Sequence, residues 1–92
     1  ISPTDGSTVS GTSIVFEWNA VGGATNYAVQ VSTDASFSPL FHYNYTRGAT
    51  SCTYNDFPDD GSGYYWRVRA YNAAGWGEWS SVWSFTNGTS PP

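Results

Sequence analysis

The chain has 92 residues and a formal net charge of −4, and 11% of its residues are charged whereas 18% are aromatic. This length fits one small domain and excludes a second, and low charge with abundant rings excludes a disordered chain. Lysine is absent and the three arginines form no run, so we expect neither nucleic-acid binding nor attraction to an anionic membrane. No membrane insertion is expected, because no run approaches the ~18 apolar residues of a span.

The chain is predicted to be all-β, because short alternating runs recur between glycine-rich breaks and no stretch has helical periodicity. The alternation predicts strands in 1–9, 13–18, 26–31, 40–46, 50–55, 64–72 and 79–86. The run 40–46 alternates weakly and is expected at a sheet edge. The strongest turn signal is Asp56–Gly63, which contains a proline and two glycines.

Seven short strands at this spacing predict an immunoglobulin-like antiparallel β-sandwich, with a small barrel as the alternative. Successive side chains of a strand point to opposite faces, so most strands are expected to contribute a ring or a branched side chain to a shared core. The residues predicted for this core are Phe16, Trp18, Tyr27, Val29, Tyr54, Tyr64, Trp66 and Val68.

Four motifs in order resemble a fibronectin type III domain over nearly the whole chain. "TSIVFEWNA" is similar to the second strand of that family, with Trp18 at the centre of the sandwich, and "NYAVQVST" resembles the third, with Tyr27 pointing inward. "YNDFP" and "YYWRVRAYN" resemble the corner of the family, where Phe57, Pro58 and Tyr64 match its apolar residue, proline and tyrosine. The resemblance implies a seven-stranded sandwich in which the Tyr64 hydroxyl hydrogen-bonds back to the turn.

We expect a domain at 1–87, followed by a linker at 88–92, whose sequence "GTSPP" is typical of a semi-rigid connection. The chain contains no methionine, and we interpret it as a piece of a longer protein. Its first residues and its "WS…WSF" ending resemble modules of bacterial and archaeal secreted or surface proteins. The expected location is therefore extracellular or cell-surface, the expected partners are neighbouring domains, and the isolated domain is expected to be a monomer.

Groups that could perform catalysis are few. His42 is the single histidine and is expected to be exposed without a special role, and Cys52 is the single cysteine and is expected to be buried filler. The adjacent Asp59 and Asp60 lie in a tight turn, where they do not face each other across a cleft. We therefore expect no enzymatic activity and no cofactor.

Two patterns near polar turns have weak support. Oxygen ligands for calcium could come from 55–60, but the spacing of a calcium loop is missing, so no metal is expected. Asn44 and Asn87 match the N-glycosylation acceptor pattern, and unmodified side chains are the default interpretation.

The candidate contact residues for a ligand or partner are Trp76, Trp79, Arg67 and Arg69. Period-two counting places both arginines on the outward face of their strand, where an indole from the last strand could stack on a guanidinium. The "WS" repeats resemble the tryptophan–arginine stacks of cytokine-receptor domains, although "WSSVWS" has one residue too many. Trp79 is expected to close one end of the sandwich, and Trp83 to point inward.

Trp76 lies between two glycines in a predicted loop. It could be a platform that stacks on a sugar ring or on an apolar residue of a partner, or a lid folded back on its own loop. We therefore expect a non-catalytic spacer module of a larger protein, with recognition of a polysaccharide or a protein around Trp76 as the alternative function.

Overall fold

In the computed structural model, the described residues are 1–38 and 40–88, and they form eight strands and no helix. The strands are β1 (Ser7–Val9), β2 (Ile14–Glu17), β3 (Asn26–Ser32), β4 (His42–Thr46), β5 (Ser51–Tyr54), β6 (Ser62–Asn72), β7 (Gly75–Trp76) and β8 (Trp83–Asn87). Within these residues there is accordingly no helix of the length and apolarity that a membrane crossing requires.

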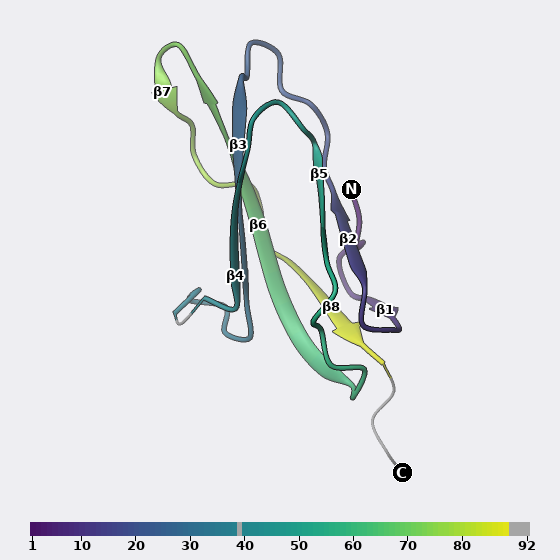
Figure 1. The fold of residues 1–92 in the computed structure, drawn as a ribbon. Helices are drawn as coiled ribbons and strands as arrows, with labels where there is room; N and C mark the ends of the chain where they lie inside the picture. The colour runs from purple at the N-terminus through teal and green to yellow at the C-terminus, as the bar shows by residue number, and fades with distance from the viewer. Residues whose placement is uncertain (39, 89–92) are drawn as a thin grey trace.

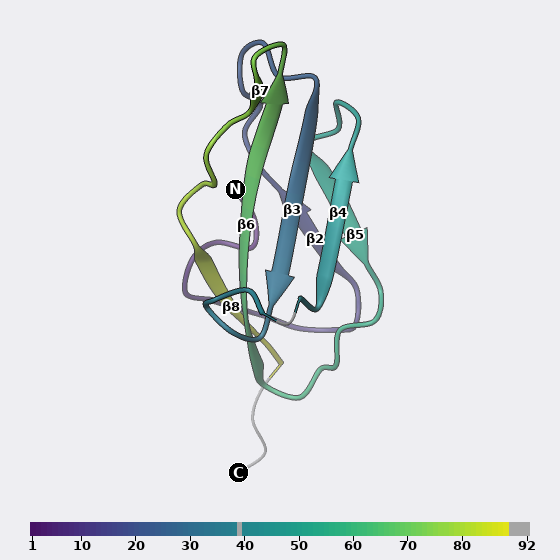
Figure 2. The ribbon, with the colours of Figure 1, turned by 90° about the vertical axis from the view of Figure 1, so that its left-hand side faces the viewer.

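The strands form two facing sheets (Figure 1). The larger sheet has the order β1-β8-β6-β3-β4, with β7 also paired to β6, and the smaller sheet consists of β2 and β5. Figure 2 shows the larger sheet face-on, with β4 at its edge, as predicted for the run 40–46. The pairings are antiparallel except that of β1 with β8, which is parallel and aligns Ser7 with Phe85. The predicted all-β sandwich is confirmed.

Of the last predicted strand, 79–86, only the part from Trp83 onward forms a strand, β8, whereas the additional strand β7 forms in the predicted loop around Trp76. Residues between them still follow β6, because the Gly77 N–H donates to the Ala70 carbonyl and the Ser80 N–H donates to the Val68 carbonyl. The Val68 N–H, however, donates to the Ser80 hydroxyl at 3.0 Å instead of to a backbone carbonyl. A side chain thus replaces one backbone hydrogen bond of the ladder, and β8 begins at Trp83 instead of at Trp79. The pairing of β7 with β6 gives eight strands where seven were expected.

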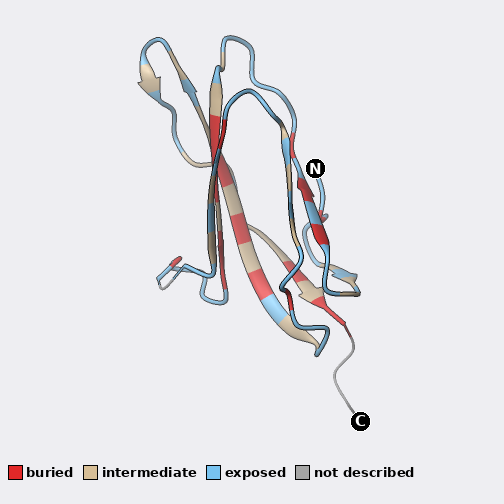
Figure 3. Cartoon of the chain, viewed as in Figure 1, coloured by how far each residue is buried: buried red, intermediate tan, exposed pale blue. Residues whose placement is uncertain are grey.

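The buried residues lie on the facing sides of the two sheets (Figure 3), and most of them carry aromatic rings or branched side chains. Phe16 is fully buried, and its ring centroid lies 5.3–6.1 Å from those of Trp66, Phe85, Phe57 and Tyr54. Of the residues predicted for the core, Tyr54 is half-buried and packs against it, and the others are buried: Phe16, Trp18, Tyr27, Val29, Tyr64, Trp66 and Val68. Trp83, which was expected to point inward, is half-buried with its ring 4.6 Å from that of Trp66.

Gly88, the first residue of the predicted linker, packs against the domain, and the boundary at 87 stays a prediction. Gly88 is buried, and its N–H donates to the Val9 carbonyl at 2.6 Å. The rest of the predicted linker, residues 89–92, lies outside the described residues.

Candidate functional site

The outer face of the larger sheet carries a continuous stack of rings and guanidinium groups. The Arg67 Cζ atom lies 4.2 Å from the ring centroid of Phe37 and 4.4 Å from that of Trp79. The Arg69 Cζ atom lies 4.5 Å from the ring centroids of both Trp79 and Trp76. We call this series of Phe37, Arg67, Trp79, Arg69 and Trp76 the aromatic–arginine stack.

The spacing of β6 explains why Trp79 fits between the two arginines. Residues two apart on a strand lie on the same face and are separated by about 6.6–6.8 Å, which leaves room for one indole between two guanidinium groups. Each contact of a guanidinium with a ring face contributes about 0.5–2 kcal/mol. The stack therefore holds the segment after β7 against β6 in addition to its backbone hydrogen bonds.

The two arginines have different polar surroundings. The Arg67 guanidinium donates from Nε at 2.9 Å and from Nη2 at 2.7 Å to Oε1 of Gln30, its neighbour across the strand pair. Burial, and then the nearby positive charge of Arg69, lower the pKa of Arg67 below its ordinary value. The Arg69 Nε atom is buried and has no hydrogen-bond acceptor among the described residues.

The structure brings together the predicted contact residues Trp76, Trp79, Arg67 and Arg69. It places Trp79, however, on the face of the sheet between two arginines and not at an end of the sandwich, because the interruption after β7 turns its ring outward. The Trp76 ring folds back onto Arg69 and 37% of the residue stays exposed, while its role as a binding platform stays a prediction.

Exposed tyrosines extend this surface toward the edge of the sheet. The Trp76 ring meets Tyr71 at 5.1 Å and Tyr45 at 5.6 Å between centroids, and Tyr43 lies two residues before Tyr45 on β4. These four residues, which are 37–51% exposed, form what we call the tyrosine–tryptophan patch. The sequence analysis missed Tyr43 and Tyr45, although the alternation in "HYNYT" places both on one side of a strand.

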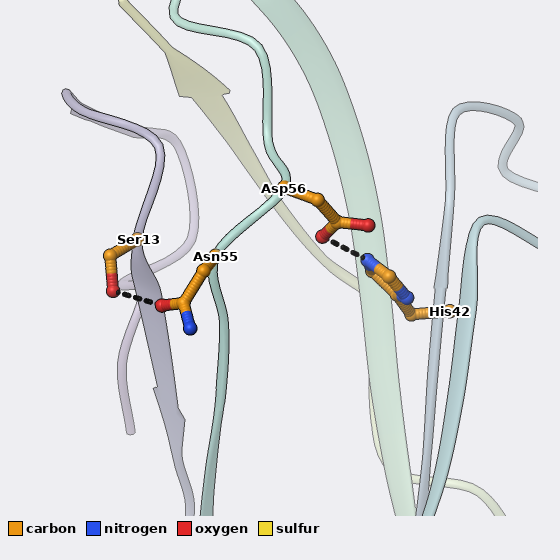
Figure 4. A network of polar contacts seen from close by, with 4 residues as sticks. All are labelled: Ser13, His42, Asn55 and Asp56. Carbon is orange, nitrogen blue, oxygen red and sulfur yellow. Dashed lines mark hydrogen bonds and ion pairs between the residues drawn. The ribbon is translucent and has the colours of Figure 1, made fainter.

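His42 links the two sheets (Figure 4), which corrects the expectation of an exposed side chain without a role. Its side chain is 17% exposed, its Nε2 lies 2.8 Å from Oδ1 of Asp56, and its ring stacks on Tyr54 at 3.8 Å. In the same connection the Ser13 hydroxyl donates to Asn55 Oδ1 at 2.8 Å. Two of the side chains considered as calcium ligands, Asn55 and Asp56, thus make polar contacts within the fold.

The described residues contain no group of three or more His, Cys, Asp or Glu side chains placed to hold a metal ion. Cys52 is half-buried, and burial raises the pKa of its thiol, an effect that a hydrogen bond with Asn44 opposes. These surroundings disfavour the thiolate that nucleophilic catalysis requires.

Asn87, one of the two glycosylation patterns, is fully buried. Its amide nitrogen donates to the carbonyls of Gly11 at 2.9 Å and Pro58 at 2.8 Å. Since both amide hydrogens are used, a glycan on this nitrogen is incompatible with the folded domain.

The corner implied by the family resemblance is present as a packing arrangement. The Tyr64 ring lies 4.9 Å from that of Phe57 and 5.4 Å from that of Phe85. Burial raises the pKa of the Tyr64 hydroxyl, the Asp60 charge adds to this, and a hydrogen bond with the Ser62 side chain opposes it. The ring packing of the corner is thus present, whereas no hydrogen bond from the Tyr64 hydroxyl back to the backbone of the turn is found among the described residues.

The sequence profile described as "Fibronectin type III domain" matches residues 2–86 of the chain. A search of curated proteins found no relative that matches. The chain is structurally similar to a Fn3-like protein from Clostridium thermocellum, with a TM-score of 0.70, 20% identity and coverage of 100% of both chains.

Two further solved structures have the same fold. The human fibronectin type III domain containing protein 3 contributes a domain with a TM-score of 0.63 and 20% identity, over 87% of this chain and 76% of that one. The FN1-FN3 domains of chicken CNTN1 match with a TM-score of 0.62 and 16% identity, over 98% of this chain and 33% of that one. With its sandwich, its ring core and the profile match over 2–86, the chain belongs to the fibronectin type III family.

Proposed function

We propose that this domain is a non-catalytic structural module that separates other domains in a larger secreted or cell-surface protein. Fibronectin type III domains are generally non-catalytic structural modules, are typical of modular multidomain proteins, and commonly occur in extracellular or cell-surface proteins. The observation that carries the proposal is the aromatic–arginine stack, which joins β6, the loop containing Phe37 and the segment after β7 into one unit.

The geometry suits a spacer because β6 runs along most of the sandwich. Its eleven residues span about 36 Å at the rise of an extended strand. The stack lies against the outer side of this strand, while the ring core packs against its inner side. Both faces of the longest strand are therefore held by side-chain contacts, which favours a module that keeps its length.

Small-angle X-ray scattering on the parent protein, with and without this domain, tests the spacer function. We expect the maximum dimension of the parent to shorten by at least about 36 Å when the domain is deleted, because this is the length of β6 alone. A parent in which the domain folds back against its neighbours, and whose maximum dimension does not change on deletion, contradicts the proposal.

A second function, recognition of a polysaccharide or a protein, is favoured by the tyrosine–tryptophan patch. Tyrosine, tryptophan and arginine are enriched among the residues that dominate binding energies, and the patch places the first two types beside Arg69.

Tryptophan fluorescence of the domain, titrated with soluble polysaccharides, tests the glycan form of this second function. We expect a saturable change that Tyr45→Ala reduces, because Tyr45 contacts Trp76 without taking part in the stack. Val82→Ala is the matched control, since Val82 is 42% exposed and lies outside the patch. No spectral change with the unaltered domain removes the glycan form.

A further inference from the structure

A groove opens on the flank of the sandwich, between the connection of β2 to β3 and the interrupted segment from β7 to β8. Its volume is about 430 Å³, which falls within the range of about 300–1,000 Å³ for pockets that bind small molecules. Apolar side chains make up most of the lining: Ile1, Trp18, Val21, Tyr27, Val68 and Trp83. It is separate from the tyrosine–tryptophan patch, whose members do not line it.

Two buried nitrogen atoms without a hydrogen-bond partner belong to residues that line this groove. Trp18 is 6% exposed, and its Nε1 has no acceptor among the described residues, nor has the Arg69 Nε. The contrast is Trp66, whose Nε1 donates to the Pro3 carbonyl at 3.3 Å. Buried indole N–H groups usually find an acceptor, so the two lone donors point to an acceptor that the domain itself does not supply.

Two hydroxyl groups on the lining, those of Tyr27 and Ser80, already have hydrogen-bond partners within the domain. The Tyr27 hydroxyl accepts from the Val21 N–H at 2.9 Å, and the Ser80 hydroxyl accepts from the Val68 N–H and donates to the Ser81 carbonyl. Glu78 also lines the groove, but it forms no ion pair with Arg69 within the described residues. The buried polar side-chain atoms of the lining residues that lack a partner, Trp18 Nε1 and Arg69 Nε, are thus both donors, whereas Glu78 is exposed to solvent.

We propose that this groove binds a small, mostly apolar ring compound that carries a carboxylate. The ring would be buried against the tryptophan and tyrosine side chains, and the carboxylate would accept a hydrogen bond from the Trp18 indole near the positive charge of Arg69. The proposal does not depend on the spacer function, since a ligand in this flank leaves the length of the sandwich unchanged.

Nuclear magnetic resonance of the ¹⁵N-labelled domain, titrated with 2-naphthoate, tests the site. The indole N–H signal of Trp18, identified by its loss in Trp18→Phe, should move saturably and in the direction of hydrogen-bond formation. The matched probe is 2-naphthylmethylamine, which has the same ring but a cationic donor in place of the acceptor, and it should bind about tenfold more weakly if one charged hydrogen bond is lost.

Two variants localise the binding. Val21→Glu places a carboxylate at the mouth of the groove and should weaken 2-naphthoate binding about tenfold through like-charge repulsion. Val15→Glu makes the same change at an exposed valine of β2 that does not line the groove, and binding should be unaffected. Ala70→Leu should fill the groove and abolish binding, whereas Ala73→Leu, in the loop before β7, should not.

The expected pattern is a moving Trp18 signal, discrimination between the two probes, and loss of binding in the groove variants alone. A Trp18 signal that stays unmoved up to the solubility limit of 2-naphthoate overturns the proposal. Equal binding of the two probes, or equal weakening by Val21→Glu and Val15→Glu, also overturns it. Both glutamate variants change exposed positions, so their dispersed spectra verify folding in the same experiment.

Discussion

Gly88 follows the last residue of β8, and its backbone conformation requires glycine. Its φ is +88°, a conformation that side-chain-bearing residues rarely adopt, and a Cβ atom there would lie 2.8 Å from the carbonyl carbon of Asp59. Its N–H donates to Val9, so the residue joins the ends of β1 and β8. The need for glycine comes from both the torsion angle and the close approach of another backbone.

Gly88→Ala is expected to lower the free energy of unfolding by at least about 1 kcal/mol, because alanine is strained at positive φ and collides with the Asp59 backbone. Urea denaturation at constant pH measures the change. The matched control is Gly22→Ala, at a position without positive φ and with open space around it. A similar small effect of both substitutions would show that Gly88 is not constrained.

Tyr54 has a pKa well above the ordinary value for tyrosine. Burial, followed by the charges of Cys52 and Asp56, raises the pKa of Tyr54 to about 12, while a hydrogen bond with Asn44 opposes the shift. The unfolded chain has its ordinary tyrosine pKa of about 10. The folded state therefore holds the proton more tightly, and this contribution to stability is complete below about pH 10 and lost as the pH rises toward about 12.

The unfolding free energy is thus expected to fall between about pH 10 and about pH 12, and Tyr54→Phe should make that fall shallower. Urea denaturation across this range, together with phenolate absorbance, measures both quantities. Burial also raises the pKa of Tyr64, so part of the slope should remain in the variant. An identical slope with and without the Tyr54 hydroxyl would contradict the assignment.

At the level of elements, the segment from β7 to β8 shows what periodicity can and cannot predict. Alternation in β6 correctly places Arg67 and Arg69 on the outer face, since both stack on rings there. The same counting puts Trp79 and Phe85 on one face, but Trp79 lies outside and Phe85 is buried. A hydroxyl that replaces one rung of the ladder shifts the register between them, and a pattern of apolar residues contains no signal for such a replacement.

His42 was expected to be exposed, and the reason that this was wrong lies in the tertiary structure. A short run of aromatic residues on an edge strand predicts exposure, and the sequence cannot show that the turn after β5 brings Asp56 to within 2.8 Å. The core, in contrast, was largely predictable. Phe16 and Trp18 flank the charged Glu17, Trp66 and Val68 flank Arg67, and a dry interior between two sheets is where such apolar residues gain most from burial.

Arg69→Met is expected to lower the free energy of unfolding by about 0.5–2 kcal/mol, because methionine keeps an apolar stem but loses the charge between Trp76 and Trp79. Urea denaturation measures the cost. Arg47→Met is the matched control, since Arg47 is exposed and outside the stack, and its effect should be near zero. Comparable effects at the two sites would remove the stack as a source of stability.

At the scale of the whole molecule, the ring cluster around Phe16 holds the two sheets together. Phe16 belongs to β2 of the smaller sheet, while Trp66 and Phe85 belong to the larger one. The contacts between the sheets are mainly side-chain contacts of this kind, because backbone hydrogen bonds run within each sheet. The cohesion of the sandwich therefore depends on a small number of large residues.

Phe16→Ala is expected to cost about 3–5 kcal/mol by creating a cavity at this junction, a large share of the ~5–15 kcal/mol that stabilises a typical domain. Thermal and urea denaturation measure the loss. Val15→Ala, at an exposed position of the same strand, should change little. A loss below about 1 kcal/mol for Phe16→Ala would be inconsistent with the packing described, given the usual range for buried aromatic residues.

The parallel pairing of β1 with β8 determines how the domain responds to a pull on its two ends. The chain enters β1 from Ile1 and leaves β8 toward Gly88, and in a parallel pair these two points lie at opposite ends of the shared ladder. Tension applied there slides the strands lengthwise, so that the hydrogen bonds between them must break together. In an antiparallel pair that is pulled at its open end, the hydrogen bonds break one at a time, which requires a smaller force. The parallel pairing of β1 with β8 does not open in this way.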